Sequence, residues 1–184
     1  MPWNLPNTLT WTRIAAIPLI VLLFYMPYPW ADPAAGLLFA AAGITDSLDG
    51  YFARRFGQVS RLGAFLDPVA DKLIVAVALV LLVAKDPRAL IVLTAAVIIG
   101  REITISALRE WMAQIGARRK VAVSQLGKFK TILQITGLSM MLYRIPLLGL
   151  PTYSLGVVLT EVAAFATLVS MLMYLRAAWP ELSR

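Results

Sequence analysis

The chain has 184 residues, of which 60% are hydrophobic and only 15% are charged, and its mean hydropathy is +0.77. Soluble domains carry about 45–50% apolar and about 25% charged residues, so the composition predicts a membrane protein. The net charge of +7 is then better explained by basic loops that face anionic lipid than by nucleic-acid binding. The chain has no cysteine and no histidine. This excludes disulfides, thiolate nucleophiles, Cys/His zinc sites and histidine bases.

The length suits about six membrane spans of roughly 20 residues each. We therefore predict an all-α membrane protein with six transmembrane helices in one domain, residues 1–184. Residues 1–8 are rich in proline and are expected to form a short segment at the membrane interface. The expected spans are Leu9–Tyr25, Pro33–Arg54, Leu62–Ala84, Ala89–Trp111, Val121–Tyr143 and a last one that follows the loop Arg144–Thr152 and ends near Trp179.

Individual residues inside these spans also carry expectations. Pro18 is expected to be a tolerated kink in the first span. Gly36, Gly43 and Gly137 are expected to permit close contact between helices, because glycine lets two backbones approach.

The basic residues predict the orientation of the spans. With six spans, both termini share a side with the loops that follow the second and fourth spans. That side carries most of the Lys and Arg residues, whereas the opposite side has only Lys85, Arg88 and Arg144. The positive-inside rule therefore predicts that both termini and these two loops are cytoplasmic.

Four aspartates lie inside two of the expected spans. Asp46 and Asp49 are three residues apart and Asp67 and Asp71 are four apart, so each pair shares one face of a helix. A turn around residues 57–58 would bring Asp49 level with Asp67 and Asp46 level with Asp71. Clustered carboxylates repel in a low-dielectric layer unless cations lie between them. Oxygen ligands without His or Cys favour Mg²⁺, Mn²⁺ or Ca²⁺, and a pair of such ions would bind a phosphate or diphosphate.

The residues around these acids fit the pattern Asp-x2-Asp-Gly-x2-Ala-Arg-x8-Gly-x3-Asp-x3-Asp. Its fixed positions are Asp46, Asp49, Gly50, Ala53, Arg54, Gly63, Asp67 and Asp71. In this pattern the chain resembles the CDP-alcohol phosphotransferase family. A shorter match near the start also resembles many members, and it consists of Pro6, Asn7, Leu9, Thr10 and Arg13.

The resemblance implies a six-helix membrane enzyme, usually a homodimer, in the bacterial inner (cytoplasmic) membrane. Such an enzyme moves a phosphatidyl group from CDP-diacylglycerol to an alcohol and releases CMP. The resemblance implies two Mg²⁺ or Mn²⁺ ions, with Asp46 and Asp67 touching both, Asp49 one and Asp71 the other. Asp71 would also take the proton of the acceptor hydroxyl, and the absence of histidine independently favours a carboxylate base. Contacts with CDP are implied for Gly50, Ala53, Arg54, Ser60, Gly63, Asn7 and Thr10.

The acceptor is predicted from weaker signals. The stretches Ile44–Asp46, Arg101–Trp111 and Val121–Lys128 resemble members that use glycerol 3-phosphate. The phosphate of that acceptor is a dianion and needs basic partners. The candidates are Arg109, Lys128, Arg118 and Arg101.

The sequence leaves alternatives open for individual residues, for the acceptor and for the class of protein. Arg101 is also placed to form a structural pair with a membrane acid, and Arg118 to face lipid headgroups. Another acceptor (inositol phosphate, serine or phosphatidylglycerol) would use the same chemistry. A divalent-cation transporter, in which the acids line an ion pathway, is the alternative from another class. The absence of a repeat with broken helices disfavours it.

Overall fold

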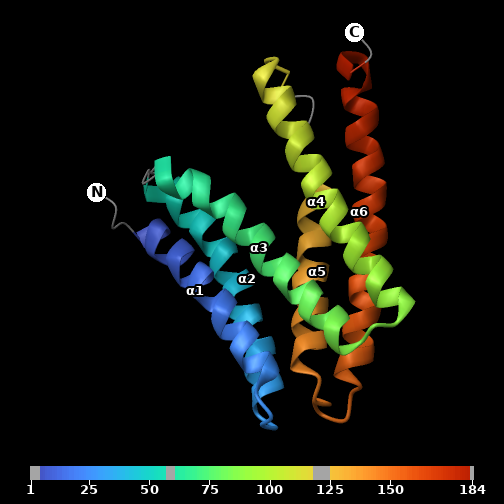
Figure 1. Cartoon of the computed structure of the whole chain (residues 1–184). Helices are drawn as coiled ribbons and strands as arrows, with labels where there is room; N and C mark the ends of the chain where they lie inside the picture. Colours follow the sequence, from blue (N-terminus) through green and yellow to red (C-terminus); the bar gives the residue numbers. More distant parts are fainter. Residues whose placement is uncertain (1–4, 57–60, 118–124, 183–184) are drawn as a thin grey trace.

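The computed structural model describes residues 5–56, 61–117 and 125–182 and shows an all-helical chain over these ranges (Figure 1). Within them, side chains are described except at 5–7, 9, 46–56, 61–62, 64 and 125–128. The helices are α1 (Leu5–Tyr25), α2 (Ala31–Phe56), α3 (Arg61–Lys85), α4 (Ala89–Gln114), α5 (Gln125–Tyr143) and α6 (Thr152–Leu182). In the described ranges no strand forms, and Leu147 and Leu150 make an isolated bridge.

Each expected span corresponds to one helix, with shifted ends. The largest difference is at the start, where α1 already begins at Leu5, so that residues 5–8 are its first turn and not a separate segment. Pro6 is compatible with this because the first turn of a helix has no partner for the missing N–H. Further along, α1 continues through Pro18. Residues 121–124 of the fifth predicted span lie outside the described residues.

Among the described residues, α4 and α6 are long and apolar enough to cross a membrane, with mean hydropathies of 1.8 and 2.0. The apolar stretches of α1 and α2, Thr10–Tyr25 and Ala31–Thr45, are shorter. In α3 the charged residues of the first turns interrupt the apolar sequence. Large apolar side chains such as Leu93 and Phe165 remain exposed around the helices, as expected for surfaces in contact with lipid.

The helices run up and down, and α1 to α3 form one group while α4 to α6 form another (Figure 1). The larger apolar core joins both groups through residues such as Ile20, Phe39, Leu82, Ile98 and Leu138. A second, smaller core lies between the carboxyl-terminal halves of α4 and α6.

Three glycines allow the helices to approach, as the sequence predicted. A Cβ at Gly36 would lie 2.6 Å from the backbone nitrogen of Tyr143, and one at Gly43 would lie 2.6 Å from Cγ2 of Ile135. At the contact of α5 with α6, a Cβ at Gly137 would lie 2.9 Å from the carbonyl oxygen of Gly156. At Gly36 and Gly137 the neighbours include backbone atoms, so only glycine fits there without moving a helix, whereas at Gly43 the Ile135 side chain would have to shift.

Polar contacts join the helix ends at the lower end of the molecule in Figure 1. Lys85 Nζ lies 2.8 Å from Oδ1 of Asp32 and connects the end of α3 to the start of α2. In the turn between α3 and α4, Arg88 donates through Nε and Nη2 to Asp86 at 2.8 and 2.6 Å. The hydroxyl of Tyr153 on α6 donates to the same carboxylate. The Arg88 guanidinium, together with this hydroxyl, holds the pKa of Asp86 well below its usual range.

Candidate active site

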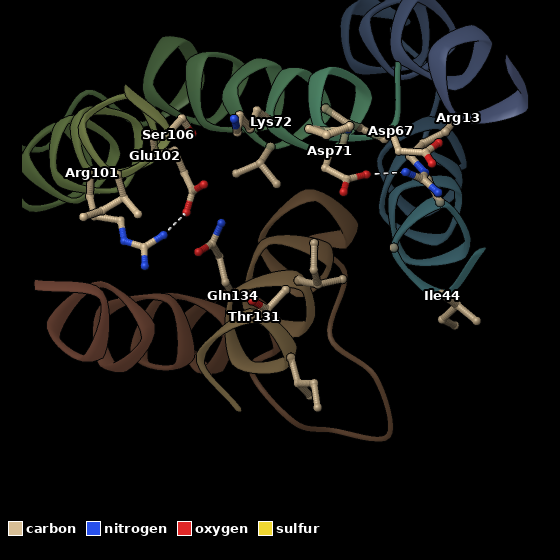
Figure 2. Close-up of a pocket in the computed structure, with 18 of the residues that line it drawn as sticks. Arg13, Ile44, Asp67, Asp71, Lys72, Arg101, Glu102, Ser106, Thr131 and Gln134 are labelled. Atoms are coloured by element: carbon tan, nitrogen blue, oxygen red, sulfur yellow. Dashed lines mark hydrogen bonds and ion pairs between the residues drawn. The ribbon is translucent and has the colours of Figure 1, made fainter. Parts of the chain in front are cut away.

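A cavity of about 710 Å³ lies among the helices, and α1 to α5 all contribute to its wall. Figure 2 shows Asp67, Asp71 and Arg13 on one side of this cavity and Arg101 and Glu102 on the other. Thr131 and Gln134 of α5 lie between the two sides in that view. The cavity thus has an acidic end at Asp67 and Asp71 and a basic end at Arg101.

At the acidic end, Asp67 and Asp71 both line the cavity, one helical turn apart on α3. Thr10 of α1 donates a hydrogen bond to Asp67, and Arg13 of α1 forms an ion pair with Asp71. Thr10 and Arg13 are three residues apart, so a single face of α1 meets both carboxylates. The Arg13 side chain is only 1% exposed, and a guanidinium buried so deeply requires a carboxylate partner.

The donor set at this end suits a hard divalent cation. Asp67 and Asp71 offer carboxylate oxygens to one cavity, and oxygen-only ligands fit Mg²⁺ or Mn²⁺. Asp46 and Asp49 lie in the carboxyl-terminal half of α2, but their side chains are outside the described residues. Among the residues that are described, no group of three or more acidic side chains gathers at one point.

Most residues expected to contact CDP also lie outside the described side chains. These are Asn7, Gly50, Ala53, Arg54 and Ser60. Thr10 is described and lies against Asp67, and Gly63 is buried in the first turn of α3.

At the basic end, Glu102 of α4 joins two cations from different helices. Its Oε1 accepts from Arg101 Nη1 at 2.7 Å and lies 3.4 Å from Nζ of Lys130 on α5. The side chains of Arg101 and Lys130 are each only 6% exposed. The structural pair that was the alternative for Arg101 therefore exists, and its partner is the neighbouring residue in the sequence.

Arg109 lies two turns further along α4, lines the same cavity and donates from Nη2 to the hydroxyl of Tyr174 at 3.0 Å. The Nε atoms of Arg101 and Arg109 are buried and have no hydrogen-bond partner among the described residues. The other two predicted acceptor residues cannot be compared with the cavity. Arg118 lies outside the described residues, as does the side chain of Lys128 on α5.

The sequence analysis did not select Lys130, Gln134 or Glu102 as site residues. Lys130 had one available signal, because it is a charged residue close to the apolar part of a predicted span. Glu102, Ile105 and Arg109 are spaced to share one stripe of a helix, and all three line the cavity. The approach of Lys130 to Glu102 depends on how α5 packs against α4, which periodicity alone does not predict.

Carboxylates and guanidinium groups thus share one cavity inside an apolar helical protein. Residues 3–177 match the family model described as CDP-alcohol phosphatidyltransferase. The chain is 49% identical over 182 residues to the CDP-diacylglycerol–glycerol-3-phosphate 3-phosphatidyltransferase of Shigella flexneri serotype 5b (strain 8401). It is 50% identical to the protein of the same name from Escherichia coli (strain K12), and each alignment covers 99% of this chain and 98% of the relative. The chain therefore belongs to the CDP-alcohol phosphatidyltransferase family.

Proposed function

We propose that this protein transfers the phosphatidyl group of CDP-diacylglycerol to a hydroxyl of sn-glycerol 3-phosphate, which gives phosphatidylglycerophosphate and CMP. The observation that carries this proposal is near-complete alignment, at 49–50% identity, with relatives named for this reaction. The cavity supports it because carboxylates and basic groups face a common space. The step belongs to phospholipid biosynthesis.

At the acidic end, the proposed metal ligands are Asp46, Asp49, Asp67 and Asp71, holding two Mg²⁺ or Mn²⁺ ions. Ions held by these carboxylates would supply charge neutralisation of the diphosphate and so make CMP a better leaving group. Asp71 takes the proton of the acceptor hydroxyl as the oxygen attacks the β-phosphorus of CDP-diacylglycerol. The ion pair with buried Arg13 supports this role, because it fixes the direction of the carboxylate.

The same end is proposed to bind the CDP group. The residues assigned to it are Asn7, Thr10, Gly50, Ala53, Arg54, Ser60 and Gly63. What supports this is the hydrogen bond of Thr10 to Asp67, because it brings the start of α1 next to one of the proposed metal ligands.

At the basic end, Arg101 and Arg109 are proposed to bind the phosphate of the acceptor, together with Arg118 and Lys128, and Lys130 joins this set. The support is electrostatic. A buried guanidinium N–H without a partner is costly, and the Nε atoms of Arg101 and Arg109 are two such groups within the described residues. Both residues belong to the wall of the cavity, so a phosphate dianion bound there would pair with their guanidinium groups. Glu102 offsets only part of the positive charge of this end.

We further propose that residues 1–184 form one domain with six membrane-spanning helices, that the protein is a homodimer in the bacterial inner membrane, and that both termini and the active site are cytoplasmic. The apolar lengths of α4 and α6 support the spans. The alternating directions of the helices place the connections with few basic residues at one end (Figure 1). Trp30 and Trp179 are exposed near opposite ends, as in an aromatic belt.

The test uses the purified full-length protein in detergent with CDP-diacylglycerol and glycerol 3-phosphate. We expect release of CMP, formation of phosphatidylglycerophosphate, and loss of both on chelation with restoration by Mg²⁺ or Mn²⁺. A panel with inositol phosphate, serine and phosphatidylglycerol tests the acceptor, and a clear preference for one of these over glycerol 3-phosphate would overturn the assignment. Divalent-cation flux in proteoliposomes without CMP release would favour a transporter instead.

A further inference from the structure

Helix α6 lies behind the basic end of the cavity. None of the described lining residues belongs to α6, yet two of its polar side chains contact the arginines that do line the cavity. Tyr174 accepts a hydrogen bond from Arg109 Nη2 at 3.0 Å, and Ser170, one turn earlier, lies 3.4 Å from Arg101 Nη2. These contacts join α6 to α4 over long sequence separations.

The ring of Tyr174 also faces both cations. The Cζ atom of Arg109 lies 5.0 Å from the ring centroid, and that of Arg101 lies 6.0 Å from it. Two guanidinium groups repel each other, and the negative face of an aromatic ring offsets part of that repulsion where water is excluded. Both contacts with the ring therefore help to keep the two arginines close to each other, as binding of one anion by both side chains requires.

The tyrosine itself is held rigidly. It is 7% exposed and packs in the smaller apolar core with Ile105, Leu108, Met112 and Ala178. A ring fixed in this way defines where each guanidinium lies. With Nη2 of Arg109 on the Tyr174 hydroxyl and Nη2 of Arg101 facing Ser170, both guanidinium groups keep a set direction.

We infer that Tyr174 and Ser170 are positioning residues, which hold Arg109 and Arg101 in the arrangement that receives the phosphate dianion of the acceptor alcohol. This inference rests on the proposed function. It adds that α6 determines the affinity for the phosphorylated acceptor without touching the substrate. An arginine released from α6 would have more freedom, and that freedom would be lost again on each binding event.

The test measures steady-state kinetics for both substrates in three variants. Tyr174→Phe keeps the ring and removes the hydroxyl, Tyr174→Leu removes both, and Ser170→Ala removes the contact with Arg101. We expect the KM for glycerol 3-phosphate to rise a few-fold in Tyr174→Phe and Ser170→Ala, and about tenfold or more in Tyr174→Leu, since both the cation–π contact and the hydrogen bond are then lost. The KM for CDP-diacylglycerol should stay unchanged.

Thr167→Val is the matched control. Thr167 is fully buried on the same side of α6, one turn before Ser170, and its Oγ1 has no hydrogen-bond partner among the described residues. Replacing this hydroxyl by a methyl group should leave both KM values unchanged.

The outcomes separate the inference from the function on which it rests. If the unmodified protein makes no phosphatidylglycerophosphate, the proposed function fails. If the unmodified protein is active and Tyr174→Phe, Ser170→Ala and Tyr174→Leu all keep the KM for glycerol 3-phosphate, the inference fails alone. It fails equally if both KM values and the Tm change together, because that pattern indicates a structural role. Should Tyr174→Leu not fold, Tyr174→Phe and Ser170→Ala decide the question.

Discussion

Asp71 has two properties that a catalytic base needs. It faces the cavity, and its direction is fixed by an ion pair with the buried Arg13. The planar guanidinium of Arg13 donates along fixed directions and so orients the Asp71 carboxylate. In a chain without histidine, a fixed carboxylate of this kind is the group best placed to accept a proton from a substrate hydroxyl. The role of Asp71 therefore depends on its direction as much as on its charge.

Asp71→Asn is expected to keep nucleotide binding and to lose turnover by about 10²–10⁴-fold, the usual contribution of a general base. The amide retains the size of the side chain but accepts no proton from the acceptor. Incorporation of radiolabelled glycerol 3-phosphate measures turnover, and equilibrium binding of CDP measures the nucleotide site. Asp32→Asn is the control, because Asp32 pairs with Lys85 away from the cavity. Full turnover in Asp71→Asn would contradict the assigned role.

Single residues also show how far the sequence alone reaches. Asp67 and Asp71 could be assigned to one face from their spacing, and Arg101 and Arg109 from their charge inside a predicted span. In the sequence, Tyr174 is one of several aromatic residues in apolar spans, and nothing there indicates a role at the site. Its contact with Arg109 arises from the packing of α6 on α4, a long-range feature that no local pattern encodes.

At the scale of whole helices, the crossing of α5 and α6 depends on two glycines that face each other. A Cβ at Gly137 would lie 2.9 Å from the carbonyl oxygen of Gly156, and a Cβ at Gly156 would lie 2.7 Å from the carbonyl oxygen of Gly137. Because these neighbours are backbone atoms, they can move only if the helices separate.

Gly137→Ala is therefore expected to destabilise the protein by about 1–3 kcal/mol, the usual cost of overpacking. Thermal unfolding in detergent measures this. Gly100→Ala on α4 is the matched control, since a Cβ there meets nothing within 4 Å. That variant should be neutral or slightly more stable, because alanine favours the helix. Equal Tm values for the two variants would contradict the close crossing.

The turn between α3 and α4 carries a pH dependence. The folded pKa of Asp86 is lowered, chiefly by Arg88, relative to about 3.9 in an unfolded chain. The stabilisation is then present above about pH 4 and is lost as the pH falls further. Asp86→Asn should lower the Tm at pH 7 by at most about 2–4 °C, and the difference should shrink progressively as the pH falls below about 4 toward the lowered pKa of Asp86.

Glu110→Gln on α4 is the control for this measurement, because its side chain is exposed. A Tm difference between Asp86→Asn and the unmodified protein that stays constant down to pH 3 would show that Asp86 does not act through its charge.

For the whole molecule, hydropathy and spacing predicted the number and order of the helices, and the described residues confirm them. The start of α1 was predicted wrongly, because the span was expected from Leu9 after a proline-rich interfacial segment, whereas α1 begins at Leu5 and its first turn tolerates Pro6. The grouping of α1 to α3 beside α4 to α6 was not predicted. The grouping follows from side-chain contacts across the core. The cavity, with its acidic and its basic end, lies where the two groups of helices meet.

The orientation of the molecule in the membrane gives the last prediction. Lys85, Arg88 and Arg144 are the basic residues expected at one end, and most of the others are expected at the opposite end. Since translocation disfavours Lys and Arg near the ends of spans, the end with few of them should face the periplasm. The natural absence of cysteine makes the question accessible, because any introduced thiol is the only one in the chain.

Pro87→Cys places a thiol in the exposed turn between α3 and α4, and Gln114→Cys places one at the exposed end of α4. A membrane-impermeant maleimide added to spheroplasts should label the thiol at position 87 and not the one at position 114. In inverted membrane vesicles the pattern should reverse, and in detergent both should react, which controls for accessibility. Labelling at position 114 in intact spheroplasts would place the cavity's basic end outside the cytoplasm. Glycerol 3-phosphate and CDP-activated lipid would then have to be supplied from the wrong side, and both the orientation and the proposed reaction would have to be abandoned together.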